Sequence, residues 1–128
     1  MKLIIAGSRD FQSNPFEWME ALDMYDEKCG PIMEIVSGGA RGPDTWGAQY
    51  GRSRNIPVTF FYPDWNAYGK SAGYRRNRQM GVYATHLLTF WDEQSRGTRH
   101  MMDIMKELKK PSFTFVRRPS GLYGYDTH

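Results

Sequence analysis

The stretch Val36-Ser37-Gly38-Gly39-Ala40-Arg41-Gly42-Pro43-Asp44 passes from a β-branched, apolar residue to three glycines, a proline and a carboxylate. We predict a strand, a tight loop and the start of a helix. Gly38, Gly39 and Gly42 allow positive φ and a close approach to a ligand, because they have no Cβ. Pro43 suits the first helical position, where its missing N–H costs nothing. The free N–H groups and the dipole of such a helix favour an anion, so this loop is a candidate phosphate site.

The same stretch matches one signature of nucleotide-binding loops and differs from another. No Lys-Ser or Lys-Thr follows its last glycine, so it is not a Walker A loop. It does follow the Gly-x-Gly-x-x-Gly pattern of dinucleotide-binding loops, with Ser37 in the first position. A glycine-rich turn that only connects a strand to a helix would give a similar pattern. Support for a phosphate site must therefore come from the rest of the chain.

Composition indicates one domain of ordinary size. At 128 residues the chain is long enough for one core and too short for two comfortable domains. The net charge of +3, with acids and bases interspersed, does not by itself imply a nucleic-acid partner. The single cysteine, Cys29, excludes an internal disulfide and fits a reducing compartment. Neither a signal peptide nor a membrane span is recognisable, so we expect a cytoplasmic protein that does not contact membranes.

Apolar runs alternate along the chain with stretches of helical periodicity. Strands are expected at residues 3–6, 33–36, 58–62, 86–91 and 112–116. Helices are expected at about residues 16–29, 43–54, 74–83 and 98–109. Residues 65–74 have no clear period and are expected to form a long functional loop. Residues 117–128 are expected to form a loosely ordered tail after the single domain, residues 1–116.

This alternation predicts an α/β fold, a Rossmann-like three-layer sandwich whose mainly parallel five-stranded sheet has the order 3-2-1-4-5. Ligands of such folds bind beyond the carboxyl ends of the strands, where the winding direction reverses. The loops after the first, second and fourth strands would converge there. These loops contain Gly7-Ser8-Arg9, residues 37–44 and Ser95-Arg96-Gly97-Thr98.

Arginines recur in the loops expected at this edge. Guanidinium groups bind phosphate through paired hydrogen bonds and keep their charge, so several of them around one cleft would suit a polyanionic ligand. Any one of them alone could be an ordinary solvated residue. Thr98 is expected to cap a helix whose free N–H groups face a second anionic or ribose oxygen, although such caps are common. The arginines are Arg9, Arg41, Arg76 and Arg96.

Two carboxylates have both ordinary and functional interpretations. Asp44, in a first helical turn, is ordinarily a partner of the helix dipole, but it could bind ribose hydroxyls or act as an acid or base. Asp64 follows the next strand, where dinucleotide-binding folds place a ribose-binding carboxylate, and it could equally be a turn residue. Trp65, Tyr68 and Tyr74 could stack on a base or pack the loop onto the core. No metal is expected, since no ligand spacing links His86, His100 and His128.

Five ordered motifs resemble the small YspA/YpsA-related branch of the SLOG superfamily. They are Gly7-Ser8-Arg9-x-Phe11, Ser37-Gly38-Gly39-Ala40-Arg41-Gly42-x-Asp44, Asp64-Trp65 with Tyr68-Gly69-Lys70 and Ala72-Gly73, Arg76-Asn77-x-x-Met80, and Ser95-Arg96-Gly97-Thr98. The resemblance runs from residue 1 to about residue 116. Five motifs in order at suitable spacing are far more specific than any one of them.

The resemblance implies a Rossmann-like domain that binds a nucleotide or nucleotide-derived ligand, often as a homodimer or larger assembly. Related proteins include phosphoribohydrolases that release cytokinin bases, formerly described as lysine decarboxylases, and a DNA-processing protein that binds single strands. In the hydrolases a glutamate tied to N-glycosidic cleavage lies three residues after the Gly-Thr pair, where this chain has Met101. This departure argues against hydrolysis unless Asp44 or Glu93 substitutes for it. The implied ligand-binding residues are Gly7, Ser8, Arg9, Ser37, Gly38, Gly39, Ala40, Arg41, Gly42, Asp44, Asp64, Arg76, Asn77, Ser95, Arg96, Gly97 and Thr98.

Three functions remain open from the sequence. The first is binding of a nucleotide or ADP-ribose-like molecule for sensing or sequestration, with no cofactor required. The second is an N-glycosidase or phosphoribohydrolase, with Asp44 and Arg76 as the candidate catalytic residues. The third, which we consider weaker, is single-stranded nucleic-acid binding by charge and stacking. Its candidate residues are Lys70, Arg75, Arg76 and Arg78, with Trp65, Tyr68 and Tyr74 between them.

Overall fold

Strand β1 (Lys2–Gly7) lies inside a six-stranded sheet in a computed structural model that describes residues 1–127. The sheet has the order β3-β2-β1-β4-β5-β6. The other strands are β2 (Glu34–Ser37), β3 (Val58–Phe60), β4 (His86–Phe90), β5 (Ser112–Arg118) and β6 (Gly121–Asp126). The helices are α1 (Pro15–Cys29), α2 (Pro43–Arg54), α3 (Trp65–Tyr68), α4 (Ala72–Tyr83) and α5 (Arg96–Glu107), with a 3₁₀ turn at Gly69–Ser71.

The first five strands run parallel, so the expected Rossmann-like order 3-2-1-4-5 is confirmed for them. Strand β1 pairs with β2 on one side and with β4 on the other, with Ile4 opposite both Val36 and Leu87. Its apolar residues are buried on both faces, as parallel strands between two helical layers must be. The reversal of winding direction therefore falls beside β1.

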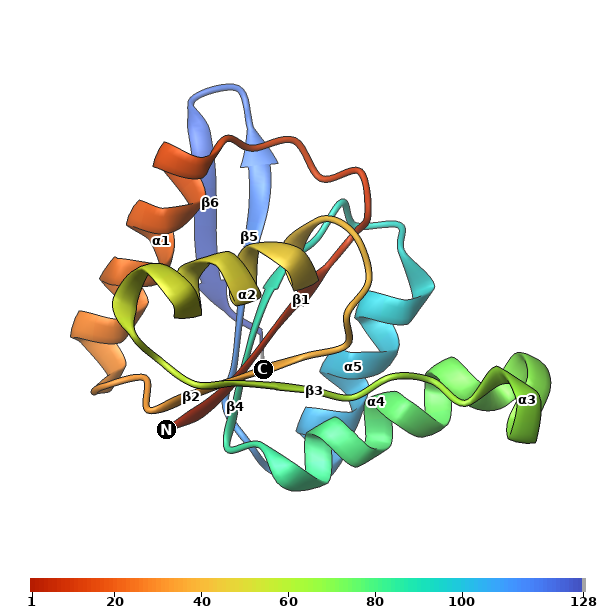
Figure 1. Cartoon of the computed structure of the whole chain (residues 1–128). Helices are drawn as coiled ribbons and strands as arrows, with labels where there is room; N and C mark the ends of the chain where they lie inside the picture. The colour runs from red at the N-terminus through yellow and green to blue at the C-terminus, as the bar shows by residue number, and fades with distance from the viewer. Residues whose placement is uncertain (128) are drawn as a thin grey trace.

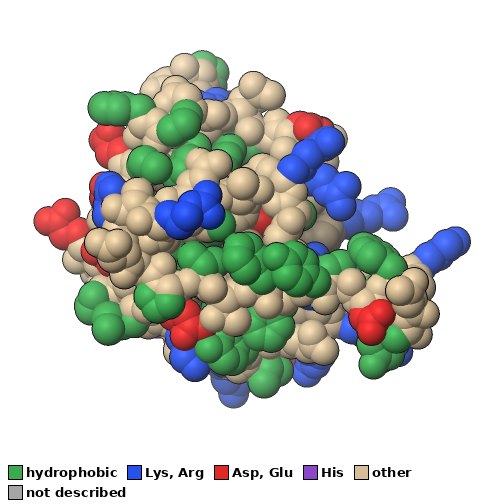
Figure 2. Space-filling view, in the orientation of Figure 1, with side chains coloured by type: hydrophobic (Ala, Val, Ile, Leu, Met, Phe, Trp, Pro, Cys, Tyr) green, Lys and Arg blue, Asp and Glu red, His purple; other side chains and the backbone are tan. Residues whose placement is uncertain are grey.

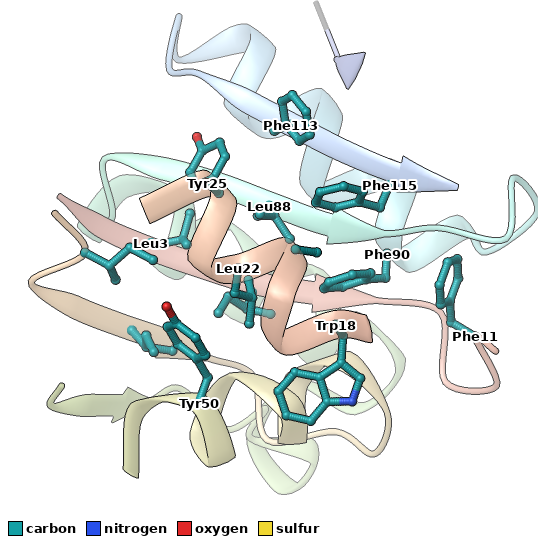
Figure 3. Packing of buried hydrophobic residues seen from close by; sticks show 14 residues of the cluster. Leu3, Phe11, Trp18, Leu22, Tyr25, Tyr50, Leu88, Phe90, Phe113 and Phe115 are labelled. Atoms are coloured by element: carbon teal, nitrogen blue, oxygen red, sulfur yellow. The ribbon is translucent and has the colours of Figure 1, made fainter. Parts of the chain in front are cut away.

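Two hydrophobic clusters form the core, one on each face of the sheet. Alternate residues of β1 point to opposite faces, so Leu3 contributes to one cluster and Ile4 to the other. Helices α1 and α2 cover the first face (Figure 1), and Figure 3 shows Trp18 of α1 in the cluster there. Trp18 also stacks on Trp46 of α2, with ring centroids 5.4 Å apart. Helices α4 and α5 cover the second face with methionine-rich surfaces. This is the three-layer sandwich that the sequence predicted.

The expected tail is wrong, because β5 continues to Arg118 and residues 121–126 return as a sixth, antiparallel strand. Gly121 takes a positive φ of 127° at the turn. Gly124 then lets β6 lie directly against the phenylalanines of β5, since a Cβ there would be 2.6 Å from Phe113 Cε1. The glycines of this segment thus allow a hairpin to form, where we had expected a loosely ordered tail. Within the described residues the sheet therefore has six strands instead of five. Residue 128 lies outside them.

Residues 65–74 are also more ordered than expected. They comprise α3, the 3₁₀ turn and the first turn of α4, which begins two residues earlier than predicted. Asp64 caps α3, since its Oδ1 accepts a hydrogen bond from Ala67 N at 3.0 Å. In Figure 1 α3 lies at the end of the molecule away from α1.

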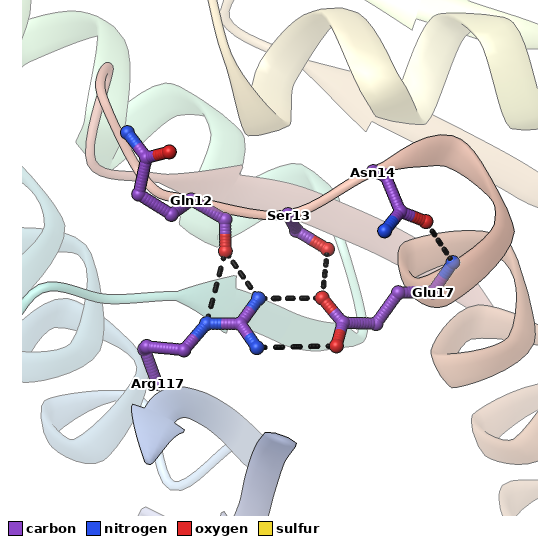
Figure 4. A network of polar contacts seen from close by, with 5 residues as sticks. All are labelled: Gln12, Ser13, Asn14, Glu17 and Arg117. Atoms are coloured by element: carbon purple, nitrogen blue, oxygen red, sulfur yellow. Dashed lines mark hydrogen bonds and ion pairs between the residues drawn. The ribbon is translucent and has the colours of Figure 1, made fainter. Parts of the chain in front are cut away.

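An ion pair joins the end of β5 to the start of α1. The guanidinium of Arg117 donates to both carboxylate oxygens of Glu17 and to the backbone oxygen of Gln12 (Figure 4). Ser13 Oγ also donates to Glu17, at 2.6 Å, and Asn14 caps the helix by accepting from Glu17 N at 2.9 Å. These contacts hold one end of the loop between β1 and α1, which carries functional candidates at its other end.

No helix within residues 1–127 combines the length and apolarity needed to cross a membrane.

Candidate functional site

A cavity of about 380 Å³ lies at the carboxyl ends of β1, β2 and β4, beside the reversal of winding direction. The loops after these strands and the buried side of α4 line it. Figure 2 shows Lys and Arg side chains on the side of the molecule where these loops lie in Figure 1. The predicted residues that meet here are Gly7, Ser8, Arg9, Ala40, Asp44, Arg76, Asn77, Ser95, Gly97 and Thr98.

Asp44 is the buried acid of this cavity, with only 6% of its surface exposed. Its Oδ2 accepts a hydrogen bond from Ala40 N at 3.3 Å. Burial raises the pKa of Asp44 to about 6, although the N–H groups of Ala40 and Gly38 and the charges of Arg76 and Arg9 oppose this. A carboxyl group with such a pKa can exchange a proton near neutral pH.

Arg76 enters the site from α4 and supports the glycine-rich loop. Its Nη1 donates to Gly38 O at 2.6 Å and to Phe61 O at 3.2 Å. Burial lowers the pKa of Arg76, and the nearby carboxyl of Asp44 opposes that effect. Arg76 is therefore a structural support of the loop as well as a positive charge in the cavity.

Gly38 is required for close approach rather than for positive φ. A Cβ at this position would lie 2.7 Å from Arg76 Nη1 and 2.8 Å from Asp44 Oδ2. Gly39 and Gly42 do have the predicted positive φ, at 75° and 82°. Gly39 and Gly42 thus shape the turn, and Gly38 leaves room for the carboxyl of Asp44 and the guanidinium of Arg76.

The loop uses several of its polar groups internally instead of presenting all of them to a ligand. Ser37 is fully buried, and its Oγ accepts from Gly39 N at 3.1 Å and donates to Asp44 O at 3.0 Å. Thr45 N donates to Gly42 O at 2.9 Å in the first turn of α2. The N–H of Ala40 in this loop therefore binds the carboxylate of Asp44, and Ser37, Gly38, Gly39 and Gly42 do not line the cavity.

The opposite wall contains a residue that the sequence reading missed, Asp92. Its backbone N donates to Ser8 Oγ at 2.9 Å, and its Oδ1 accepts from the N–H groups of Gln94 and Ser95. Burial alone would raise the pKa of Asp92, but these N–H groups hold it below its usual value. The sequence did contain a signal for this role of Asp92, namely an Asp directly after a strand with a Ser three residues later. Ser95, not Thr98 as predicted, is the N-cap of α5, and Thr98 lies in its first turn.

Three further predicted residues do not line the cavity. Arg41 points to solvent and pairs with Asp10 at 3.1 Å. Arg96 lines a neighbouring cavity instead of this one, and Asp64 caps α3. Of the four arginines that were expected around one cleft, Arg9 and Arg76 line this cavity, and Arg41 and Arg96 do not.

Comparison with known proteins identifies the family. Residues 1–68, just over half of the chain, match the YspA, cpYpsA-related SLOG family. The chain belongs to this SLOG family. A similar protein is the gene 61 protein of Mycobacterium phage D29, which is 30% identical over 126 residues, covering 92% of this chain and 98% of that protein. The family inferred from the five motifs is thus confirmed, by a match that covers the first two motifs and the start of the third.

A solved structure has the same fold as this SLOG protein. It is that of DNA processing protein A from Helicobacter pylori, which is 18% identical, with a TM-score of 0.64 over 94% of this chain and 67% of the other. That work concerns the single-stranded DNA binding mode of the Helicobacter protein. At this identity the likeness supports the α/β fold alone.

The surface considered for single strands is only partly assembled in this SLOG protein. Arg75 lies over the ring of Tyr68 at 4.4 Å, and Arg78 pairs with Glu107 at 3.0 Å. Arg76 turns inward to the glycine-rich loop and is not part of that surface. The remaining candidates, Lys70, Trp65 and Tyr74, are exposed.

Proposed function

We propose that this SLOG protein binds a nucleotide or a nucleotide-derived, phosphate-containing small molecule in the 380 Å³ cavity, and thereby senses or sequesters it. One observation carries the proposal: Arg9 and Arg76 converge with buried polar groups in a single hollow at the reversal of winding direction. Such a site combines charge for a phosphate with acceptors for a sugar.

The two kinds of side chain suggest a division of roles. Arg9 is exposed at the cavity and can form paired hydrogen bonds with a phosphate group. The carboxylates of Asp44 and Asp92 are acceptors that suit ribose hydroxyls. We therefore favour a ligand with both a sugar and a phosphate over a simple anion.

Calorimetric titration with nucleoside monophosphates and ADP-ribose tests this proposal. Replacing Arg9 by Ala should weaken binding about 10- to 100-fold, because hydrogen bonds to charged groups contribute about 1.5–3 kcal/mol. Arg52→Ala is the matched control, since Arg52 is an exposed arginine in the last turn of α2, outside the cavity. Absence of binding to every compound, or equal losses in both variants, would contradict the proposal.

One observation favours a second candidate, an N-glycosidase. Asp44 is a buried acid with a pKa near 6 inside the same cavity, as a proton donor to a leaving base would require. Chromatography of nucleoside monophosphates incubated with the protein would detect the free base. Release that Asp44→Asn abolishes would support catalysis, and unchanged nucleotide after long incubation would exclude it.

Single-stranded DNA binding is a third candidate, favoured by exposed Trp65 and Tyr68 next to Arg75. The fold shared with a single-stranded-DNA-binding protein is consistent with this candidate but is not evidence for it. Fluorescence anisotropy of a labelled oligonucleotide tests the idea. Binding that weakens steeply with salt and is lost in Trp65→Ala would support it; no change in anisotropy at low salt would reject it.

A further inference from the structure

A second cavity, of about 520 Å³, lies beside the proposed nucleotide site. It is bounded by α4, by the loop after β4 and by α5, and its walls include Tyr74, Trp91 and His100. Ser95 lines both cavities, so the two hollows meet at the start of α5. The first two functions considered above make no use of this space, and Tyr74 is the residue that it shares with the candidates for single-strand binding.

A thin polar partition separates the two cavities. Asn77 lines the first cavity, and its side-chain Nδ2 lies 3.3 Å from His100 Nδ1 and 3.4 Å from Gly97 O. His100 lines the second cavity. One side chain thus faces each hollow, and the hydrogen bond between them fixes both. A ligand that bends around this partition can occupy both spaces.

The walls of the second cavity are aromatic and held in place. Trp91 Nε1 donates to Ser95 O at 3.2 Å, which fixes the indole against the loop. The rings of Tyr74 and His100 lie edge to face with centroids 4.5 Å apart. Tyr74 nevertheless leaves 49% of its surface exposed. A fixed aromatic side chain with an open surface is suited to stacking on a planar group.

The charges around this cavity largely neutralise one another. Arg99 pairs with Asp103 at 3.3 Å, and Glu93 pairs with Arg118 at 2.9 Å. Among the charged side chains described there, only Arg96 has no ion pair of this kind. Paired charges are better suited to an uncharged heterocycle than to a phosphate. A second anionic group is therefore not what this space favours.

We propose that the second cavity is a subsite for the base of the nucleotide, in which the base stacks on Tyr74 next to Trp91 while sugar and phosphate occupy the first cavity. This inference rests on the proposed function and adds the ligand class to it. The preferred ligand carries an aromatic heterocycle, as nucleoside 5′-monophosphates do, and is not a bare sugar phosphate.

Calorimetry with two kinds of probe, with and without a base, tests the subsite without depending on catalysis. The probes are the four common nucleoside 5′-monophosphates and ribose 5-phosphate, which lacks the base. Wild-type protein should bind at least one nucleotide more tightly than the sugar phosphate. In Tyr74→Ala that affinity should fall about 5- to 150-fold, since stacking on an aromatic residue contributes about 1–3 kcal/mol per base, while binding of ribose 5-phosphate stays unchanged.

Tyr123→Ala is the matched control, because Tyr123 on β6 is 56% exposed and lies outside both cavities. It should leave both affinities unchanged, and Tyr74→Phe should retain nucleotide binding. Equal affinity for nucleotides and ribose 5-phosphate, or equal losses in Tyr74→Ala and Tyr123→Ala, would overturn the base subsite and leave the proposed function intact. If wild-type protein binds neither probe, both proposals fall together. Melting temperatures without ligand show that each variant is folded.

Discussion

Gly38 is the residue at which fold and site constrain each other most tightly. Its α-carbon lies between Arg76 and Asp44, and a Cβ would approach both to less than 3 Å. Arg76 has little freedom to withdraw, because it also donates to Gly38 O and Phe61 O. Gly38→Ala should therefore lower the free energy of unfolding by about 1–3 kcal/mol, a typical cost of overpacking, in urea denaturation.

Gly97→Ala is the control for this substitution. Gly97 also lines the cavity, but a Cβ there would meet nothing within 4 Å, and the residue lies in the first turn of α5. The free energy of unfolding of Gly97→Ala should be unchanged or higher by up to about 1 kcal/mol, because alanine favours helix more than glycine does. Equal losses in both variants would show that Gly38 is not closely packed.

The pKa of Asp44 gives stability an unusual dependence on pH. Burial raises this pKa from 3.8 to about 6 in the folded chain, so the unfolded chain loses the proton first as the pH rises. The contribution of Asp44 to the free energy of unfolding thus falls between about pH 4 and pH 6, by at most about 3 kcal/mol. Asp44→Asn removes this effect.

Urea denaturation of wild type and Asp44→Asn at pH 4 and pH 7 measures this contribution of Asp44 to the free energy of unfolding. Relative to the variant, wild type should be more stable at pH 4 than at pH 7. Comparing the two proteins at each pH cancels the carboxylates whose pKa is lowered, such as Glu17 and Asp23, which have the opposite dependence. A stability difference that does not change with pH would mean that the Asp44 carboxyl ionises as readily in the folded chain as in the unfolded one.

Sequence reasoning located the site at residue scale but not the orientation of each side chain. Spacing and topology predicted the meeting of Arg9, Asp44 and Arg76, because backbone positions at strand ends follow from the fold. Sequence reasoning could not tell which of Arg9 and Arg41 lines the cavity, because both lie in exposed loops and only packing decides which one faces inward. Asp92 was missed because its role depends on hydrogen bonds to backbone groups that a sequence does not display.

At the scale of elements, β6 depends on the absence of a side chain at Gly124. A Cβ would lie 2.6 Å from Phe113 and 2.8 Å from Phe115, two buried rings that contact each other at 5.2 Å between centroids. Gly124→Val should lower the free energy of unfolding by about 1–3 kcal/mol, since overpacking outweighs the higher strand propensity of valine. Urea denaturation checks this.

Tyr123→Val is the matched control for β6, since Tyr123 is the neighbouring residue of the strand and its side chain is exposed. A surface change of this kind should alter stability by no more than about 0.5 kcal/mol. If Gly124→Val were as stable as wild type, β6 would not pack on β5 in solution. The expectation of a loose tail would then stand.

The two elements that sequence reasoning missed share a cause. Helix α3 is short and aromatic, β6 contains two glycines, and neither element repeats a clear hydrophobic period. Their order comes from tertiary contacts, the hairpin with β5 in one case and the Asp64 cap in the other. Periodicity predicted the parallel strands and long helices well because these bury a whole face against the core.

For the whole molecule, the open edge of the sheet at β3 suggests self-association. Phe60 and Tyr62 are exposed there with stacked rings, 5.6 Å between centroids, and Trp65 follows at the start of α3. Figure 2 shows hydrophobic side chains in a band across this part of the surface. Contiguous exposed apolar surface beside an unpaired strand edge commonly marks a protein–protein contact. The expected homodimer would find its contact here.

Sedimentation velocity at tens of micromolar protein should accordingly detect a dimer, and Phe60→Lys should convert it to monomer by placing a charge in the apolar contact. Phe16→Lys is the appropriate control, because Phe16 is a more exposed aromatic residue on α1, which covers a face of the sheet instead of its β3 edge. A dimer that survives Phe60→Lys, or dissociates equally in both variants, would place the contact elsewhere. A wild-type monomer at these concentrations would leave the aromatic band available to another partner and would restrict the proposed nucleotide site to residues of a single chain.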